Sequence, residues 1–584
     1  MDISVLIIPL IPFFIFQISE RKETVFSLFI HYIFAIVFSF ILTRVIFEYL
    51  FLLDYSSTDY RFSVLLFFVS FIYCFGSRYA VLEKKANIKT FTYCPLVLLF
   101  LNFLSFFLLL AIKWYNKVYN LSFKDLIGTI AMPLIGTSDN VTSIIVSAGV
   151  KFVIISFVIA FAIFFIVWKK AFFHKEVVLA FESYKISLIK IFRFSHIIFS
   201  IFVLLYAFIS VNRTLKLIDY YKLVSQKTEI YEKYYVYPNS VQITKPSKMK
   251  NLIYIYLESM ETTYASKDVG GRQTENYIPN LSRLAKENIN FSASDGLGGA
   301  YSLSGAGWTM GSLFSSSSGI PFAFPIGGNS MDQAKSFASG VTAIGDILKG
   351  FGYFQEFLCG SDGNFAGRKQ FFEQHGDYNV FDIFEARRQK YISDDYWVWW
   401  GFEDSILFKI AKDELLKLSS KNQPFNFTML TVDTHHIGGY ICSLCGNNYS
   451  ERLCNVLQCQ DKQLNAFIEW CRNQDFYENT VIVITGDHPR MDTILVEGVP
   501  YHERYVYNCF INADKNVNSK KRQFGVIDLF PTVLSAMGFN IEGERLGLGT
   551  NLFSEKKTLC EELGVGKFNA ELSKYSVFYL KNFP

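Results

Sequence analysis

Two apolar stretches that each end in polar, metal-ligating side chains decide the fold predicted for this chain. Residues 251–258 read NLIYIYLE, and residues 481–488 read VIVITGDH. Runs of this length and composition are typical of buried strands in a parallel sheet. Open α/β sheets build their sites at the carboxyl ends of their strands. We therefore expect Glu258, Asp487 and His488 to lie close together at one edge of the sheet.

A glycine-rich stretch between them, residues 305–312, reads GAGWTMGS. It can turn sharply and present the hydroxyl of Thr309 at the start of a helix. Two carboxylates, an imidazole and a hydroxyl can hold a divalent cation, which makes the hydroxyl a nucleophile. Taken singly, Thr309 also fits a helix cap, and Glu258 fits a carboxylate that caps a helix at a strand end. The Asp487-His488 pair, which follows Thr-Gly and a β-branched run, favours a site over a turn.

The composition divides the chain into two unlike parts. It has 584 residues, 51% of them hydrophobic, and a mean hydropathy of +0.24. The apolar excess lies before residue 212, and a membrane span needs about 20 apolar residues. We predict a multi-span α-helical membrane domain of about six helices over residues 1–211, a juxtamembrane connector over 212–249 and an external α/β domain over 250–584. The candidate spans lie near residues 2–18, 25–53, 61–77, 93–113, 150–168 and 194–211.

Lysine and arginine are concentrated in alternate loops of the apolar part. They follow the first and third candidate spans and fill the loop 169–193, whereas the loop 54–60 has none. The positive-inside rule then places the loop 169–193 in the cytoplasm and residues 212–584 outside it. No basic region precedes the first apolar stretch, so we expect no cleavable signal peptide. The formal net charge of +4 gives no sign of a nucleic-acid partner.

Eight of the ten cysteines lie after residue 212, on the predicted external side. An even number of cysteines in an oxidising compartment favours disulfides. The close spacing of four of them also fits a zinc site. We favour disulfides, because the segment between these four is polar, and the sequence leaves their pairing open. The four are Cys442, Cys445, Cys454 and Cys459; the others are Cys359, Cys471, Cys509 and Cys560.

A set of motifs gives the chain a resemblance to a known superfamily. The motifs are YLES at 256–259, the turn around Thr309, SGIP at 318–321, LTVDTHH at 430–436 and TGDH at 485–488. Together they resemble the alkaline phosphatase/sulfatase superfamily, and within it the membrane-anchored lipoteichoic acid synthases, phosphoethanolamine transferases and phosphoglycerol transferases. The resemblance spans about residues 250 to 540. It implies an α/β alkaline-phosphatase/sulfatase-like catalytic domain beside the multi-span membrane domain.

The resemblance implies a role for each matching position. Thr309 would be the catalytic nucleophile, beside a divalent metal ion that we expect to be Mn²⁺, with Zn²⁺ or Mg²⁺ as alternatives. His435 would contact the substrate phosphate and Arg368 the glycerophosphate. Three further candidates for substrate binding are Asp362, His436 and His502, although the two histidines also fit an ordinary surface loop. The implied metal ligands are Glu258, Thr309, Asp487 and His488.

The implied reaction transfers phosphoglycerol from phosphatidylglycerol to a periplasmic or cell-envelope glycan through a phospho-threonine intermediate. The protein would be a multi-pass protein of the bacterial inner membrane, with its catalytic domain in the periplasm. Such an enzyme would work at the lipid bilayer, from which it takes its donor. A Cys/Ser-x-Pro-x-Arg motif is absent around Thr309, which argues against a sulfatase activity.

Three alternative functions stay open at this point. The first is a phosphoethanolamine transferase acting on lipid A or another envelope glycan, because the motif residues would be the same. The second is a non-catalytic membrane protein that binds envelope glycans, and the presence of all four metal-site residues speaks against it. The third is a transporter, but the candidate spans hold few charges, mainly Arg44 and Glu48, whereas transport sites need polar groups in the membrane.

Overall fold

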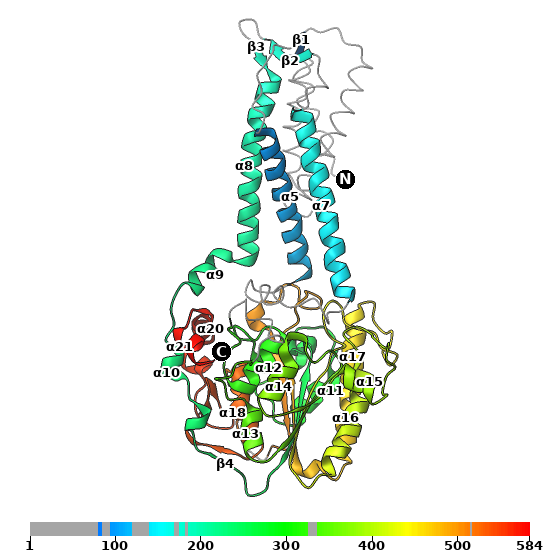
Figure 1. The fold of residues 1–584 in the computed structure, drawn as a ribbon, viewed down its shortest axis with the longest axis vertical. Coiled ribbons are helices and arrows are strands. Elements are labelled where there is room, and N and C mark those ends of the chain that lie inside the picture. The colour runs from blue at the N-terminus through cyan, green and yellow to red at the C-terminus, as the bar shows by residue number, and fades with distance from the viewer. Residues whose placement is uncertain are drawn as a thin grey trace. The chain divides into compact units, whose positions relative to one another are not determined.

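The structure is a computed structural model that describes residues 80–84, 94–119, 139–168, 175–180, 185–324, 336–513 and 517–583. The chain divides into two compact units (Figure 1). One is built from the segments Met1–Lys117 and Ile145–Lys216, and the other from Val118–Ile144 and Leu217–Pro584.

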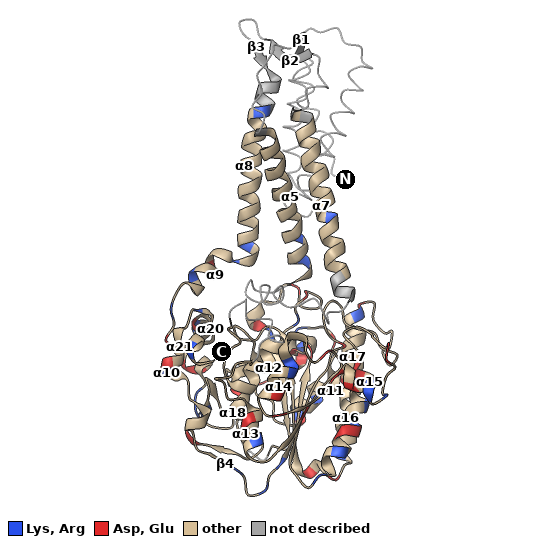
Figure 2. Ribbon diagram, viewed as in Figure 1, with Lys and Arg blue, Asp and Glu red and all other residues tan. Residues whose placement is uncertain are grey.

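The first unit contains all or most of three long apolar helices, α5 (Cys94–Val118), α7 (Asp139–Trp168) and α8 (Leu188–Leu215). Each is long and apolar enough to cross a membrane, and charged residues are sparse along all three (Figure 2). They match the spans predicted near 93–113, 150–168 and 194–211, whereas the spans predicted near 2–18, 25–53 and 61–77 lie outside the described residues. Many of their large apolar side chains are exposed, as lipid-facing residues are, among them Phe100, Phe157 and Phe208. An α-helical membrane domain is thereby confirmed.

A small antiparallel sheet also belongs to the first unit, and the sequence did not predict it. Its strands are β1 (Ala80–Lys84), β2 (Lys175–Ala180) and β3 (Lys185–Ser187), paired in that order. Strands β2 and β3 lie in the lysine-rich segment between α7 and α8, which was predicted as a loop.

The second unit is an α/β fold around a seven-stranded sheet with the order β6-β11-β10-β5-β9-β7-β8. The five strands from β10 to β8 are parallel, and β11 and β6 extend the sheet in antiparallel fashion. The predicted parallel pair is confirmed. The strands are β5 (Asn251–Leu257), β6 (Gly299–Tyr301), β7 (Phe354–Cys359), β8 (Asn379–Phe381), β9 (Phe425–Leu430), β10 (Thr480–Gly486) and β11 (Tyr505–Ile511).

Helices cover both faces of this sheet (Figure 1), so its central strands are buried throughout. Alternate residues of β5 enter different cores: Tyr254 and Tyr256 pack on one side, and Ile253 and Ile255 on the other. The first core includes α12 (Thr309–Ser318), α13 (Ile344–Gly350), α14 (Arg368–Gln374) and α18 (Leu529–Ala536). The second includes α11 (Pro279–Glu287), α15 (Ile383–Arg388), α16 (Asp404–Ser419) and α17 (Arg452–Arg472).

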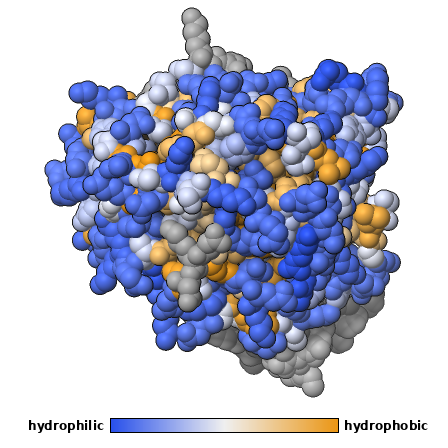
Figure 3. All heavy atoms as spheres, turned by 90° about the horizontal axis from the view of Figure 1, so that it is seen from below, coloured by the Kyte–Doolittle hydropathy of each residue, from blue (hydrophilic) through white to orange (hydrophobic). Residues whose placement is uncertain are grey.

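Short elements complete the second unit. Helix α10 (Ile230–Tyr234) buries Ile230 and Tyr231 in the first core, together with α21 (Val577–Asn582). The remaining helices are α9 (Leu217–Val224), α19 (Leu559–Leu563) and α20 (Val565–Ser573), and two small sheets pair β4 (Ile243–Thr244) with β12 (Asn540–Ile541) and β13 (Arg545–Leu546) with β14 (Gly549–Thr550). The face in Figure 3 is mainly hydrophilic, with its apolar residues in small separate patches, as suits a surface in contact with water.

Candidate active site

The register of β5 and β10 brings two carboxylates together. Leu257 pairs with Gly486, and the backbone N–H of Asp487 donates to the carbonyl of Leu257 at 3.1 Å. Glu258 and Asp487 therefore leave two neighbouring parallel strands at the same level. Both side chains are almost fully buried.

The imidazole of His488 and the hydroxyl of Thr309 complete this group. His488 Nε2 lies 3.3 Å from Asp487 Oδ2 and 3.6 Å from Glu258 Oε1. Thr309 Oγ1 lies 3.3 Å from Glu258 Oε2 and 3.3 Å from His488 Nε2. The structure thus brings together all four residues that the sequence singled out as metal ligands.

The turn before α12 sets the position of Thr309. Thr309 is the first residue of the helix, and Trp308 takes the N-cap position without a side-chain cap bond. A Cβ atom at Gly311 would lie 2.4 Å from the carbonyl oxygen of Gly305, so the turn closes only around glycine. The Thr309 hydroxyl is directed at Glu258 and His488, which does not fit the alternative role of a helix cap.

The donor atoms of the site fit a divalent cation. Asp487 Oδ1 accepts the backbone N–H groups of Ser259 and His488, both at 2.7 Å, whereas its buried Oδ2 has no hydrogen-bond partner among the described residues. His488 Nδ1 contacts the carbonyl of Pro489 at 2.9 Å. A proton on Nδ1 makes that bond and leaves the lone pair of Nε2 facing the carboxylates, as metal-binding histidines require.

The pKa shifts of the two carboxyl groups also favour a cation. Burial and the nearby charge of Glu258 raise the pKa of Asp487 well above its usual range. Burial raises the pKa of Glu258 as well, but the neighbouring His435 and His488 and the hydrogen bonds from Ser259 and Asp487 together outweigh that effect and leave this pKa lowered. In the metal-free protein the pair therefore carries less than its full negative charge. A bound cation would provide the charge needed to ionise both.

Side chains from the loop after β9 and from α17 hold Glu258 in place. The N–H of Glu258 donates to Thr431 Oγ1 at 3.0 Å, and Thr434 Oγ1 donates to the carbonyl of Glu258 at 2.6 Å. Gln460 Nε2 reaches both threonine hydroxyls, at 2.9 and 3.2 Å. Helix α17 thus helps to fix the backbone of Glu258 through these two threonines.

A buried ion-pair network, which sequence reasoning missed, joins the loop after β9 to the loop after β10. Arg490 Nη1 donates to the carbonyl of Thr434 at 2.7 Å, while its Nε and Nη2 pair with Asp492 at 2.5 and 2.6 Å. Arg504 pairs with Glu261 and donates to the carbonyl of Arg490 at 2.7 Å. The two loops are thereby fixed to one another, and so are Asp487 and His435, which they carry.

His435 forms one wall of the site. Its ring lies 4.1 Å from that of His436 and 4.4 Å from that of Trp400, measured between ring centroids. Its Nδ1 contacts the carbonyl of His436 at 2.7 Å. Burial lowers the pKa of His435, and the charge of Glu258 acts in the opposite direction. The remaining nitrogen, Nε2, is the atom that can meet a substrate.

Arg368 continues this wall through aromatic contacts. Its guanidinium lies 5.5 Å from the ring of Phe365, and that ring lies 5.5 Å from Trp400. Arg368 Nη2 donates to the carbonyl of Asp362 at 2.8 Å, while the Asp362 carboxylate accepts the N–H of Asn364. Asp362 therefore orients the arginine through its backbone.

The other two predicted substrate-binding histidines differ in burial. His436 is buried, its Nδ1 has no hydrogen-bond partner in the described part of the chain, and burial lowers its pKa well below the usual value. The side chain of His502 is 78% exposed and lies 3.9 Å from Glu503. Within the described ranges, His502 makes no hydrogen bond or ion pair with the four clustered residues.

Two tryptophans beside His435 were also missed. Trp399 and Trp400 form a buried cluster with Val432, and neither indole N–H has a hydrogen-bond partner among the described residues. A signal was present in the run YWVWW at residues 396–400, which has three tryptophans in four positions. Its functional meaning depends on the fold, because only the fold places His435 against Trp400.

The predicted disulfides are not confirmed. The eight cysteines after residue 212 are free in the structure. Four of them, Cys359, Cys471, Cys509 and Cys560, are buried members of the two cores, where a free cysteine behaves as a small apolar residue. The predicted polar segment between the four clustered cysteines is also partly helical, because Cys454 and Cys459 both lie on α17.

Comparison with known proteins shows what this chain is similar to. Residues 250–539 match the family model for sulfatases. The chain is similar to phosphoglycerol transferase I of Xanthomonas euvesicatoria, with 32% identity over 274 residues, 46% of this chain and 38% of that protein. It is also similar to phosphoglycerol transferase I of Salmonella choleraesuis, with 29% identity over 400 residues, 67% of this chain and 50% of that protein. The chain thus spans half or less of these relatives' length.

Among solved structures, the integral membrane phosphoethanolamine transferase of Neisseria meningitidis aligns with 92% of this chain and 96% of its own, at 12% identity and a TM-score of 0.43. A lipoteichoic acid synthase from Listeria monocytogenes aligns with 54% of this chain and 79% of its own, at 18% identity and a TM-score of 0.43.

Proposed function

We propose that this protein is a metal-dependent phosphotransferase that moves phosphoglycerol from phosphatidylglycerol to a cell-envelope glycan. The observation that carries the proposal is the position of the Thr309 hydroxyl, 3.3 Å from both Glu258 and His488, beside a buried carboxylate oxygen of Asp487 that accepts no hydrogen bond from the described residues. The similarity of the chain to two phosphoglycerol transferases supports phosphoglycerol as the transferred group. The domain limits of 1–211, 212–249 and 250–584 belong to the same proposal.

Glu258, Asp487, His488 and Thr309 would hold the cation, with Mn²⁺ as the expected ion. When bound, it would lower the pKa of the threonine hydroxyl and offset charge on a phosphoryl oxygen. Thr309 begins α12, whose N-terminal N–H groups also favour a negatively charged group at this position.

The reaction would proceed in two displacements at phosphorus. In the first, the oxygen of Thr309 bonds to phosphorus, the bond to the diacylglycerol oxygen breaks, and diacylglycerol leaves after taking up a proton. In the second, a sugar hydroxyl bonds to the same phosphorus, gives up its proton, and the bond to Thr309 breaks. The net reaction joins phosphoglycerol to the sugar and restores the threonine.

The wall of the site would bind the donor head group. The guanidinium of Arg368 and Nε2 of His435 are placed to offset charge on the phosphoryl oxygens. The indole N–H groups of Trp399 and Trp400 are buried donors that glycerol hydroxyls could satisfy. The buried His436 would support this wall, and the exposed His502 would act on an incoming acceptor.

The membrane helices explain why the donor would be a lipid. A catalytic domain on a membrane anchor meets phospholipid head groups at the bilayer surface, so the donor needs no carrier. We propose the bacterial inner membrane as the location, with the catalytic domain in the periplasm, from the distribution of lysine and arginine.

The test measures diacylglycerol release by the purified full-length protein with Mn²⁺, from phosphatidylglycerol or phosphatidylethanolamine in mixed micelles. We expect release from phosphatidylglycerol, stimulated by periplasmic glucan, and loss of release in Asp487→Asn. Preference for phosphatidylethanolamine would replace the proposal with a phosphoethanolamine transferase. Release from neither lipid, with metal bound and a glycan retained, would favour a non-catalytic glycan-binding protein.

A further inference from the structure

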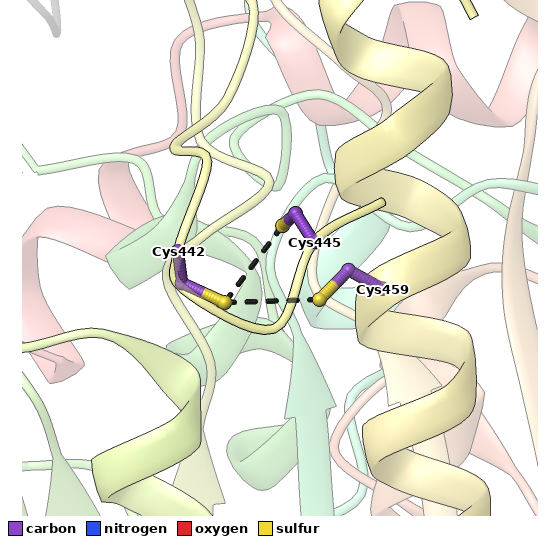
Figure 4. Close-up of side chains that lie close together, drawn as sticks. All are labelled: Cys442, Cys445 and Cys459. Carbon is purple, nitrogen blue, oxygen red and sulfur yellow. Dashed lines mark hydrogen bonds between the residues drawn. The ribbon is translucent and has the colours of Figure 1, made fainter. Parts of the chain in front are cut away.

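A second group of metal-ligating side chains lies in the loop that follows His436 and on α17. Cys442 and Cys445 come from the loop, and Cys459 comes from the third turn of the helix (Figure 4). The Sγ atom of Cys442 lies 3.7 Å from that of Cys445 and 3.7 Å from that of Cys459. All three sulfur atoms lie within 4.8 Å of one another. The active site uses none of them.

The spacing of the sulfur atoms matches a tetrahedral metal site. Zinc binds thiolates at about 2.3 Å, which places two sulfur ligands about 3.8 Å apart around a tetrahedral ion. A disulfide brings two sulfur atoms to about 2.05 Å. A disulfide would also join Cys442 to one neighbour and leave the other unused, although the two are equally distant from it. A metal ion engages all three.

The surroundings of the cluster stabilise ionised sulfur. Gln463 lies one helical turn after Cys459, and its Nε2 is 3.3 Å from the sulfur of Cys459 and 3.9 Å from that of Cys442. Amide donors that face thiolate ligands are typical of the surroundings of metal sites.

Cys454 does not belong to the cluster, although the sequence grouped it with the other three. It lies five residues before Cys459 on α17, which turns it about 140° around the helix axis. Its thiol interacts with Tyr277 instead. This cysteine therefore provides a matched control on the same helix.

We propose that Cys442, Cys445 and Cys459 bind one Zn²⁺ ion through three thiolates, with water as the fourth ligand. Cys445 is partly exposed, so water can reach the ion. Binding displaces the thiol protons into solvent. Three soft sulfur ligands select zinc over the harder Mn²⁺ or Mg²⁺.

Such an ion would fix the loop that carries His435 and His436. Gln460, the neighbour of Cys459, already holds Thr431 and Thr434 at the start of this loop. Zinc would attach the far end of the loop to the same helix. The loop would then be held to α17 at both ends, so its histidines would keep their positions.

The test measures zinc by mass spectrometry of the metal content of the full-length protein, purified in detergent without reductant or chelator. His488→Ala provides the background, because it removes a ligand of the active site. We expect one zinc per chain in this background and in His488→Ala/Cys454→Ser, and none after Cys442→Ser or Cys459→Ser is added. X-ray absorption at the zinc edge should find sulfur neighbours at about 2.3 Å.

A second measurement needs no cysteine substitution, so it does not depend on the folding of a variant. Bound zinc should protect Cys442, Cys445 and Cys459 of the native protein from alkylation until a strong chelator removes it. A disulfide between any two of these cysteines in the non-reduced protein would overturn the proposal. Zinc that stays bound after Cys442→Ser, or alkylation that chelation does not change, would overturn it as well.

Discussion

The two ligand clusters of the α/β unit are built in opposite ways. Glu258 and Asp487 follow neighbouring strands, and the pairing of Leu257 with Gly486 fixes their backbones before any ion binds. Cys442 and Cys445 belong to a loop and meet Cys459 of α17 through their side chains. A sheet can thus prepare a site for chemistry in advance, whereas a loop site would gain order from its ion. The first cluster should therefore control turnover, and the second should control the position of a loop.

The largest expected effect is on turnover alone, because Thr309 acts as the nucleophile and neither metal site requires it. Thr309→Ala should lower diacylglycerol release from phosphatidylglycerol by about 1,000-fold or more, because the first displacement needs the hydroxyl. Metal content should stay unchanged at both clusters, since two carboxylates and an imidazole remain. Rates are measured with the variant in detergent, beside metal analysis of the same sample.

Thr309→Ser is the matched control, because it keeps the hydroxyl and loses only a methyl group. We expect partial activity from it. A helix-cap role would instead leave Thr309→Ala active and cost only about 0.5–2 kcal/mol of stability. If Thr309→Ala turned over at nearly the rate of the unmodified protein, this would show that the cluster does not have the proposed chemical role.

The next prediction is that a substitution in one cluster removes the metal of that cluster and leaves the metal of the other bound. His488→Ala or Asp487→Ala should abolish Mn²⁺ binding and turnover while the protein stays folded and keeps its zinc. Cys442→Ser should lose the zinc but keep Mn²⁺ binding, and turnover should fall by about 10-fold through the loosened loop. Metal analysis, rates and thermal unfolding are compared for each variant. Loss of both metals from either variant would contradict the separation.

A third prediction concerns the pH dependence of stability and of Mn²⁺ affinity. Both should depend on the protonation of Asp487 in the carboxylate cluster. Burial and Glu258 raise the pKa of Asp487 in the metal-free protein. The folded state then holds a proton that the unfolded state releases, so this group's stabilising effect is present at low pH and is lost as the pH rises through the raised pKa. A cation must displace that proton, so Mn²⁺ affinity should fall about tenfold per pH unit below the raised pKa.

Calorimetric titration with Mn²⁺ at a series of pH values measures this dependence. The metal-free protein should also unfold more easily at neutral than at acidic pH, and Asp487→Asn should reduce that difference. An Mn²⁺ affinity that stays constant through the acidic range would show that no proton is displaced from this site.

The smallest effect tests the wall beside the carboxylate cluster. Trp400→Phe keeps the aromatic contact with His435 but removes one N–H donor, which is worth about 0.5–1.5 kcal/mol. We expect KM for phosphatidylglycerol to rise about two- to tenfold with kcat nearly unchanged. Trp397→Phe, in the same segment but 36% exposed, should leave both constants unchanged. Equal effects of the two substitutions would indicate that Trp400 acts only through the fold.

The carboxylate cluster could be predicted from the sequence because its determinants are local. A buried strand and the polar residues after it are adjacent in the chain, and the parallel sheet then places Glu258 beside Asp487. The turn at Thr309 follows in the same way from neighbouring glycines. By contrast, the contacts of Trp400 with His435 and of Arg490 with Thr434 join distant segments, so the sequence alone does not indicate them.

The cysteine cluster shows a different limit. The spacing of Cys442, Cys445, Cys454 and Cys459 suggested four equivalent residues in a polar loop. Buried residues of α17 nevertheless recur at helical spacing, with Leu453, Val456 and Leu457 followed by Leu464, Phe467 and Ile468. That period assigns Cys454 and Cys459 to different sides of one helix. The helical period therefore indicates that at most three of the four cysteines can bind one ion.

If Thr309 carries the transferred group, the covalent intermediate can be detected directly. The full-length protein with Mn²⁺ is incubated with phosphatidylglycerol without glycan, quenched in acid, and its peptides are analysed by mass spectrometry. We expect one glycerophosphoryl group on Thr309, lost when glycan is added before quenching and absent from Thr309→Ala. Diacylglycerol release at the normal rate with Thr309 unmodified, or the same adduct on another residue, would contradict it.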